Sequence, residues 1–163
     1  MHAKVVIRQT LNLNESIVDR YLADLDDADL LVRPVDGMNH IAWQLGHLIS
    51  SERGMVEAIR PGTCPPLPEG FDANYDREDT SSDDPARFLS KEAYLTLFKA
   101  QRAATKGVLD ALTDEDMDAP GPEKFRKMFP TVGNFFVLIG THVIMHVGQF
   151  VAVRRQRNKP IAI

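Results

Sequence analysis

Two histidines near the end of the chain have the spacing of a chelating pair. His142 and His146 stand in the segment Thr-His-Val-Ile-Met-His-Val-Gly-Gln, and residues four apart are neighbours on the surface of an α-helix. With about 1.5 Å of rise per residue, the two imidazole rings would lie roughly 6 Å apart along the helix axis. This spacing allows both rings to bind one divalent metal ion.

A third candidate ligand, His47, lies far earlier, in the segment Trp-Gln-Leu-Gly-His-Leu, so only the tertiary fold can bring it to this pair. Gly46 costs about 1 kcal/mol relative to alanine inside a helix, which indicates close packing there. Three histidine ligands with a fourth coordination position left open are the arrangement of a catalytic zinc site. The alternative is a hydrogen-bonded cluster of core histidines, since buried imidazoles need partners for their nitrogens.

The other polar residues near these histidines are weaker candidates. His40 lies seven residues before His47, about 10.5 Å along a helix axis, so the two do not share one ion, and we expect His40 to cap the helix, support a ligand or line a pocket. Gln149 follows His146 by three residues. We expect it either to hold a ligand water or orient substrate, or to be a polar residue where the apolar stripe reaches the end of the bundle. Glu52 points away from His47, and no His-Glu-x-x-His pattern is present, so no general base is apparent.

Composition limits the classes of protein to consider. The 163 residues fit one domain, 1–163, with a core of its own. A net charge of −4 gives no basic surface for nucleic acid. The single cysteine, Cys64, excludes an internal disulfide and has no basic neighbour to activate it. Because the first residues do not read as a secretory signal, we expect a cytoplasmic protein. We also expect a small-molecule substrate and no nucleic-acid or membrane partner.

Apolar residues recur at helical spacing in four segments, and no segment alternates as a strand would. The predicted helices cover about 3–25, 39–59, 90–112 and 131 to the basic residues at 154–159. Asn39 and Ser90 are the expected caps of the second and third helices. His142 and His146 fall within the apolar stripe of the fourth helix, so they are predicted to point inward. The pattern predicts an all-α four-helix bundle, a fold that often holds metal sites between facing helices.

The connection between the second and third predicted helices is long and unusual. Residues 61–89 contain five prolines and many acidic residues. A loop of this length in a small domain is either functional or poorly ordered. It is interpreted as a solvated acidic loop or, alternatively, as a lid over the metal site. Residues 26–38 and 113–130 are predicted as shorter connections.

Two segments are distinctive. The first is Asn39-His40-Ile41-Ala42-Trp43-Gln44-Leu45-Gly46-His47-Leu48, and the second is His142-Val143-Ile144-Met145-His146-Val147-Gly148-Gln149-Phe150. Together they resemble the DinB-like family, also called the DinB/YfiT-like metalloenzymes. The second, with its His-x-x-x-His-x-Gly-Gln pattern, is the more specific. Through the order of helices the resemblance covers most of the chain.

The resemblance implies an up-down-down-up four-helix bundle. It also implies a divalent metal, often zinc or nickel, on three histidines from the second and last helices, which are His47, His142 and His146 here. Family members include transferases that use bacillithiol, mycothiol or glutathione and a thiol-dependent maleylpyruvate isomerase, and homodimers are common among them. We therefore expect a metal-dependent S-transferase with a low-molecular-weight thiol as cosubstrate, with a homodimer as its possible assembly.

Two other functions use the same residues. A metal-dependent hydrolase would activate water with the same three ligands. A stress-response protein that binds a metal or a small molecule without turnover is favoured by the absence of an acid or base near the histidines. The sequence does not separate these functions, because the ligands are identical and the difference lies in the pocket walls.

Overall fold

Four long helices form the body of the protein. The computed structural model describes residues 2–76 and 81–162. The long helices are α1 (Ala3–Leu22), α3 (Ile41–Glu57), α4 (Lys91–Ala111) and α6 (Val132–Gln156). The short elements are α2 (Asp27–Leu30), α5 (Asp114–Asp118) and the 3-10 turns η1 (Asp72–Tyr75), η2 (Pro85–Arg87) and η3 (Glu123–Phe125). No strand occurs among these residues, so the predicted all-α class is confirmed.

Side-chain caps mark the first turns of α3, α4 and α6. Ser90 accepts a hydrogen bond from the backbone N–H of Ala93 and caps α4, as predicted. The cap of α3 is His40, and not Asn39 as expected from the sequence. The Nδ1 atom of His40 accepts the Trp43 N–H at 3.0 Å, the bond that a side-chain oxygen makes at most helix starts. An imidazole nitrogen with a lone pair can accept the same bond.

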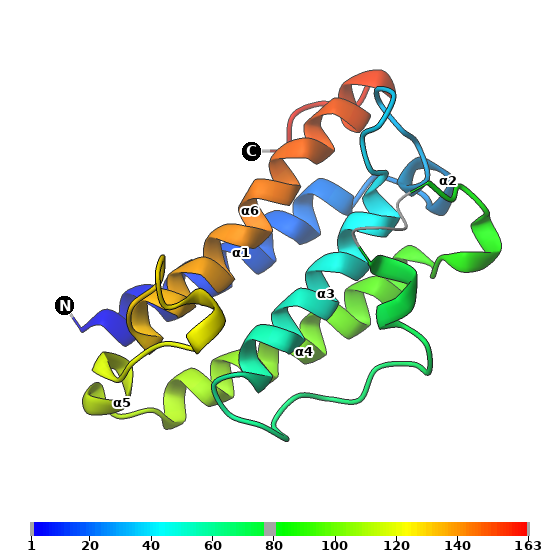
Figure 1. Ribbon diagram of the computed structural model, residues 1–163. Helices are drawn as coiled ribbons and strands as arrows, with labels where there is room; N and C mark the ends of the chain where they lie inside the picture. The colour runs from blue at the N-terminus through cyan, green and yellow to red at the C-terminus, as the bar shows by residue number, and fades with distance from the viewer. Residues whose placement is uncertain (1, 77–80, 163) are drawn as a thin grey trace.

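The bundle has the up-down-down-up arrangement. Figure 1 shows that α1 and α6 run in one direction and that α3 and α4 run in the opposite direction. Helix α1 packs against α6 and α4, and α3 packs against the same two helices. Since α3 and α4 are parallel, the chain between them must return along the whole bundle. The length of the connection from 58 to 90 therefore follows from the topology.

This connection contributes to the core as well as to the surface. Phe71 and Tyr75 are both only 4% exposed. The hydroxyl of Tyr75 lies 2.7 Å from that of Tyr94 on α4, in a buried hydrogen bond. The described part of the link is thus anchored by aromatic side chains, and the interpretation of 61–89 as simply a solvated acidic loop is incomplete.

The Tyr75 ring occupies the space in which a side chain at position 46 would lie. A Cβ atom added to Gly46 would come within 2.1 Å of Tyr75 Cε1. We expect Gly46→Ala to destabilise the protein by about 1–3 kcal/mol through overpacking, as measured by urea denaturation. Gly54→Ala on the same helix is the control, because a Cβ there meets nothing within 4 Å. Equal stability of the two variants would contradict this packing.

The most apolar helix is α6, which carries His142 and His146. Its length and composition would allow it to span a bilayer, and 44% of its most apolar window is buried in the protein. At its end the buried Arg154 donates to both carboxylate oxygens of Asp24, at 2.5 and 3.1 Å, and to the Tyr21 carbonyl. The Arg154 hydrogen bond holds the pKa of Asp24 below its usual range. The basic end of α6 therefore ties this helix to the end of α1.

Candidate metal site

Three histidine side chains converge between α3 and α6. His47, His142 and His146 each offer one ring nitrogen, and these three atoms all lie within 4.8 Å of one another. The ring centroids form a nearly regular triangle, with separations of 5.3 Å for His47 and His142, 5.2 Å for His47 and His146, and 4.9 Å for His142 and His146. The structure thus brings together the three residues that were predicted as ligands.

The backbone explains how they meet. His142 and His146 project from successive turns of α6, as their four-residue spacing predicts. His47 lies in the middle of α3, which packs directly against α6, and its side chain is only 6% exposed. Helices are rigid over these distances, so the site is built on the scaffold and not on loops.

The donor set fits one divalent metal ion. Zinc binds imidazole nitrogens at about 2.0–2.1 Å, which places two tetrahedral ligands about 3.4 Å apart. A triangle of nitrogens within 4.8 Å closes on such an ion with small side-chain movements. Among the described residues no carboxylate or thiolate belongs to this cluster. Three neutral ligands would leave the full charge of the ion in place and a coordination position open.

Neighbouring side chains hold the ring of His47. The Trp43 indole stacks flat against it, with centroids 4.9 Å apart and planes 7° apart. The Ser51 hydroxyl lies 3.4 Å from His47 Nε2. Both residues are on α3, each four positions from His47, so the helix itself fixes these contacts. The His47 ring therefore enters the site in a restricted orientation.

Gln44, which the sequence pattern does not single out as a site residue, supports a second ligand. Its Oε1 lies 3.0 Å from His146 Nδ1, and its Nε2 donates to the Asn39 carbonyl at 2.7 Å. Gln44 is only 1% exposed. The available signal was its position three residues before His47, which places the two on one helix face.

The two remaining site candidates lie in different surroundings. His40 is buried, and both its ring nitrogens face backbone groups, the Trp43 N–H and the Ser82 carbonyl at 3.3 Å. Burial lowers the pKa of His40 below its usual value. The cap accounts for the Trp43 contact, and the Ser82 carbonyl gives the second ring nitrogen a partner without a ligand. Gln149 is exposed on α6, and its role toward a ligand or substrate stays a prediction.

Glu52 and Cys64 have structural partners away from the histidines. Glu52 is buried, forms an ion pair of 2.8 Å with Arg102, and accepts a hydrogen bond from Thr105. Burial raises the pKa of Glu52. Cys64 accepts a hydrogen bond from Gln101 at 3.3 Å, and burial raises the pKa of its thiol. Neither side chain provides a base or nucleophile at the histidine cluster.

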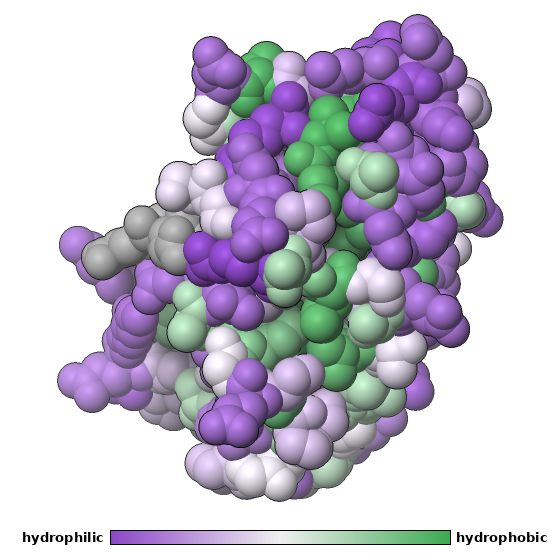
Figure 2. Space-filling view, turned by 90° about the vertical axis from the view of Figure 1, so that its right-hand side faces the viewer, coloured by the Kyte–Doolittle hydropathy of each residue, from purple (hydrophilic) through white to green (hydrophobic). Residues whose placement is uncertain are grey.

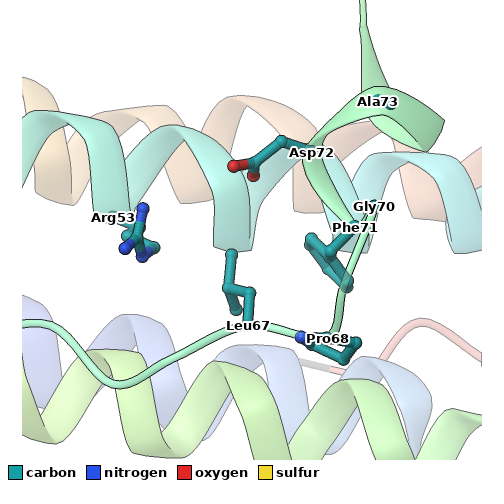
Figure 3. Close-up of a pocket in the computed structure, with 7 residues that line it drawn as sticks. All are labelled: Arg53, Leu67, Pro68, Gly70, Phe71, Asp72 and Ala73. Atoms are coloured by element: carbon teal, nitrogen blue, oxygen red, sulfur yellow. The ribbon is translucent and has the colours of Figure 1, made fainter.

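Two cavities lie outside this cluster. One, of about 280 Å³, separates α3 from the following link (Figure 3) and is lined by Arg53, Leu67, Pro68, Gly70, Phe71, Asp72 and Ala73. The other, of about 340 Å³, is lined by Asp27, Ala28, Leu31, Ala42, Pro85, Phe88, Leu89 and Ser90. Figure 2 shows a band of hydrophobic residues between hydrophilic ones on one face. None of the three histidines lines either cavity.

Comparison with known proteins agrees with the fold. A family model described as the DinB superfamily matches residues 10–150. A conserved protein from Enterococcus faecalis has a similar structure, with a TM-score of 0.74 and 19% identity over 95% of this chain and 96% of that one. YfiT from Bacillus subtilis, described as a probable metal-dependent hydrolase with an unusual four-helix bundle topology, gives a TM-score of 0.65 and 18% identity over 96% and 89% of the two chains. A search of curated proteins finds no match.

Proposed function

The chain belongs to the DinB superfamily, and from this premise we propose that it is a metal-dependent enzyme whose ion is held by His47, His142 and His146. The observation that carries the proposal is the convergence of three imidazole nitrogens from two packed helices. A divalent ion with an open position lowers the pKa of a thiol or of water, so that either becomes a nucleophile near neutral pH.

We propose further that the reaction is transfer of a low-molecular-weight thiol to an electrophile. The sulfur forms a bond to the electrophilic carbon, the leaving group departs with its electron pair, and the thiol proton goes to solvent. Such a reaction needs no general acid when the leaving group is a stable anion. This suits a cluster that has no carboxylate among the described residues.

The protein side chains position the reactants in this proposal. The histidines hold the ion, and the Trp43 indole prevents the His47 ring from turning. The Ser51 hydroxyl lies 3.4 Å from His47 Nε2. When it accepts a hydrogen bond from the Nε2–H, its own hydrogen is available to a second acceptor. A polar hydrogen at this place would orient an incoming anion.

A second candidate function is metal-dependent hydrolysis, with water in place of the thiol. The description of the similar YfiT structure favours it. Hydrolysis of an amide or ester also requires a proton for the leaving group, which is usually supplied by a general acid. Glu52 is paired with Arg102 and Cys64 with Gln101, so neither is available as that general acid. This favours thiol transfer.

The reaction test uses the protein loaded with zinc or nickel. It is incubated with bacillithiol, mycothiol or glutathione and 1-chloro-2,4-dinitrobenzene, and conjugate formation is followed by absorbance. Lowering a thiol pKa from about 8.5 to near 7 raises the thiolate fraction at pH 7 roughly ten- to twentyfold. We expect a rate increase of at least this size for the preferred thiol.

Two controls separate the possible results. A chelator and the variant His146→Ala should both remove the rate increase. Saturable thiol binding without conjugate would contradict transfer and indicate a binding protein. Metal-dependent cleavage of an activated ester without any thiol would indicate the hydrolase.

A further inference from the structure

We propose that Gln44 is a positioning residue that fixes which nitrogen of His146 carries the proton, through a hydrogen-bond relay that begins at the Asn39 backbone carbonyl. The inference rests on the metal site of the proposed function. It assigns to Gln44 a role in metal binding that its distance in sequence from His146 does not suggest.

The first step of the relay fixes the orientation of the Gln44 amide. A backbone carbonyl accepts hydrogen bonds and donates none. The Asn39 carbonyl lies 2.7 Å from the Gln44 side chain, so the atom facing it must be the NH₂ group. The amide oxygen then faces the opposite way, toward α6.

The second step fixes the tautomer of His146. The amide oxygen of Gln44 also only accepts, and it lies 3.0 Å from His146 Nδ1. Nδ1 must therefore carry the hydrogen in the neutral ring, and Nε2 carries the lone pair. A metal ion binds only a nitrogen with a lone pair. The relay thus prepares His146 to bind through Nε2.

The start of the relay is held firmly by the fold. Asn39 immediately precedes His40, the N-cap of α3, whose ring accepts the Trp43 N–H. Gln44 itself is nearly fully buried, so water does not compete for its amide. Because the relay is uncharged, it orients the ligand without adding a negative charge near the ion, unlike the carboxylate partner found at many metal-bound histidines.

Zinc affinity of Gln44 variants tests the relay. Gln44→Leu removes both hydrogen bonds and is expected to weaken zinc binding 10- to 100-fold, as measured by competition with a chromophoric chelator. Gln44→Glu no longer donates to the Asn39 carbonyl but still accepts the Nδ1–H, so it should bind zinc at least about tenfold more tightly than Gln44→Leu. Gln156→Leu changes an exposed glutamine at the last residue of α6, away from the histidines, and should leave the affinity unchanged.

A second measurement reads the tautomer directly in the metal-free protein. At a pH where the imidazoles are neutral, the ¹⁵N chemical shifts of His146 should show a protonated Nδ1 in the wild type and a shift toward protonated Nε2 in Gln44→Leu. A wild-type His146 protonated on Nε2 would overturn the relay even if the variants do not fold. Unchanged affinity of a folded Gln44→Leu would overturn it as well. Failure of the wild type to bind any metal would instead refute the proposed function, and the ¹⁵N shifts would still decide the tautomer.

Discussion

His146→Ala is expected to lose most of the metal that the wild-type protein carries. The purified wild type should contain about one equivalent of a divalent ion by elemental analysis, held by three imidazoles from two helices. Removing one ligand leaves two, and the loss of affinity should exceed the 10- to 100-fold cost of removing a supporting residue. His142→Ala should behave in the same way.

The matched control for this variant is Gln156→Ala. Gln156 is exposed at the last residue of the same helix and has no predicted role at the site, so its truncation should leave both the fold and the metal content unchanged. Circular dichroism distinguishes loss of metal from loss of structure. A folded His146→Ala protein that retains its metal would show that the ion is bound elsewhere.

The parts of this site that could be predicted from sequence are those that depend on local geometry. The spacing of His142 and His146 predicts a pair on one helix face, and the apolar stripe around them predicts their helix. The place of His47 beside them rests on a contact between α3 and α6, which the residues do not reveal by themselves. The family resemblance supplied that contact in advance.

The errors have the same physical origin. Gln44 was missed because its partner His146 lies 102 positions away. At the start of α3 the predicted cap, Asn39, is wrong, and His40 caps the helix. Adjacent polar residues can each offer an acceptor to the same backbone N–H, and only the path of the chain decides between them. Close packing at Gly46 was predicted correctly, whereas its partner, Tyr75, was not predictable from local pattern.

Arg102→Leu is expected to destabilise the protein by about 3–5 kcal/mol, because it removes one partner of a buried ion pair. Arg102 and Glu52 are 0% and 2% exposed and lie 2.8 Å apart, linking α4 to α3. The Arg102 Nε and Nη1 atoms have no hydrogen-bond partner among the described residues, so Glu52 is its main polar contact. Without the guanidinium, Glu52 would be a buried charge stabilised by the Thr105 hydrogen bond and the charge of Lys106, without its ion-pair partner.

The pH dependence of the same variant follows from the direction of the Glu52 pKa shift. Burial raises the pKa of Glu52 and the Arg102 charge opposes the rise. Loss of the Arg102 charge should therefore raise the pKa of Glu52 further. A folded-state pKa above the unfolded value of about 4.3 means that the folded protein binds a proton more readily than the unfolded one. The variant should therefore lose stability as the pH rises from the unfolded pKa through the folded one. Urea denaturation at several pH values measures this slope.

Two comparisons distinguish the buried pair from ordinary surface charges. Arg8→Leu breaks an ion pair with Asp110 whose side chains are 44% and 55% exposed, and it should cost less than about 1 kcal/mol. The double variant Arg102→Leu, Glu52→Leu should recover much of the loss, because well-packed apolar side chains replace buried ion pairs at little cost. If Arg102→Leu alone were as stable as Arg8→Leu at pH 8, water would have to reach Glu52. The interior between α3 and α4 would then be hydrated.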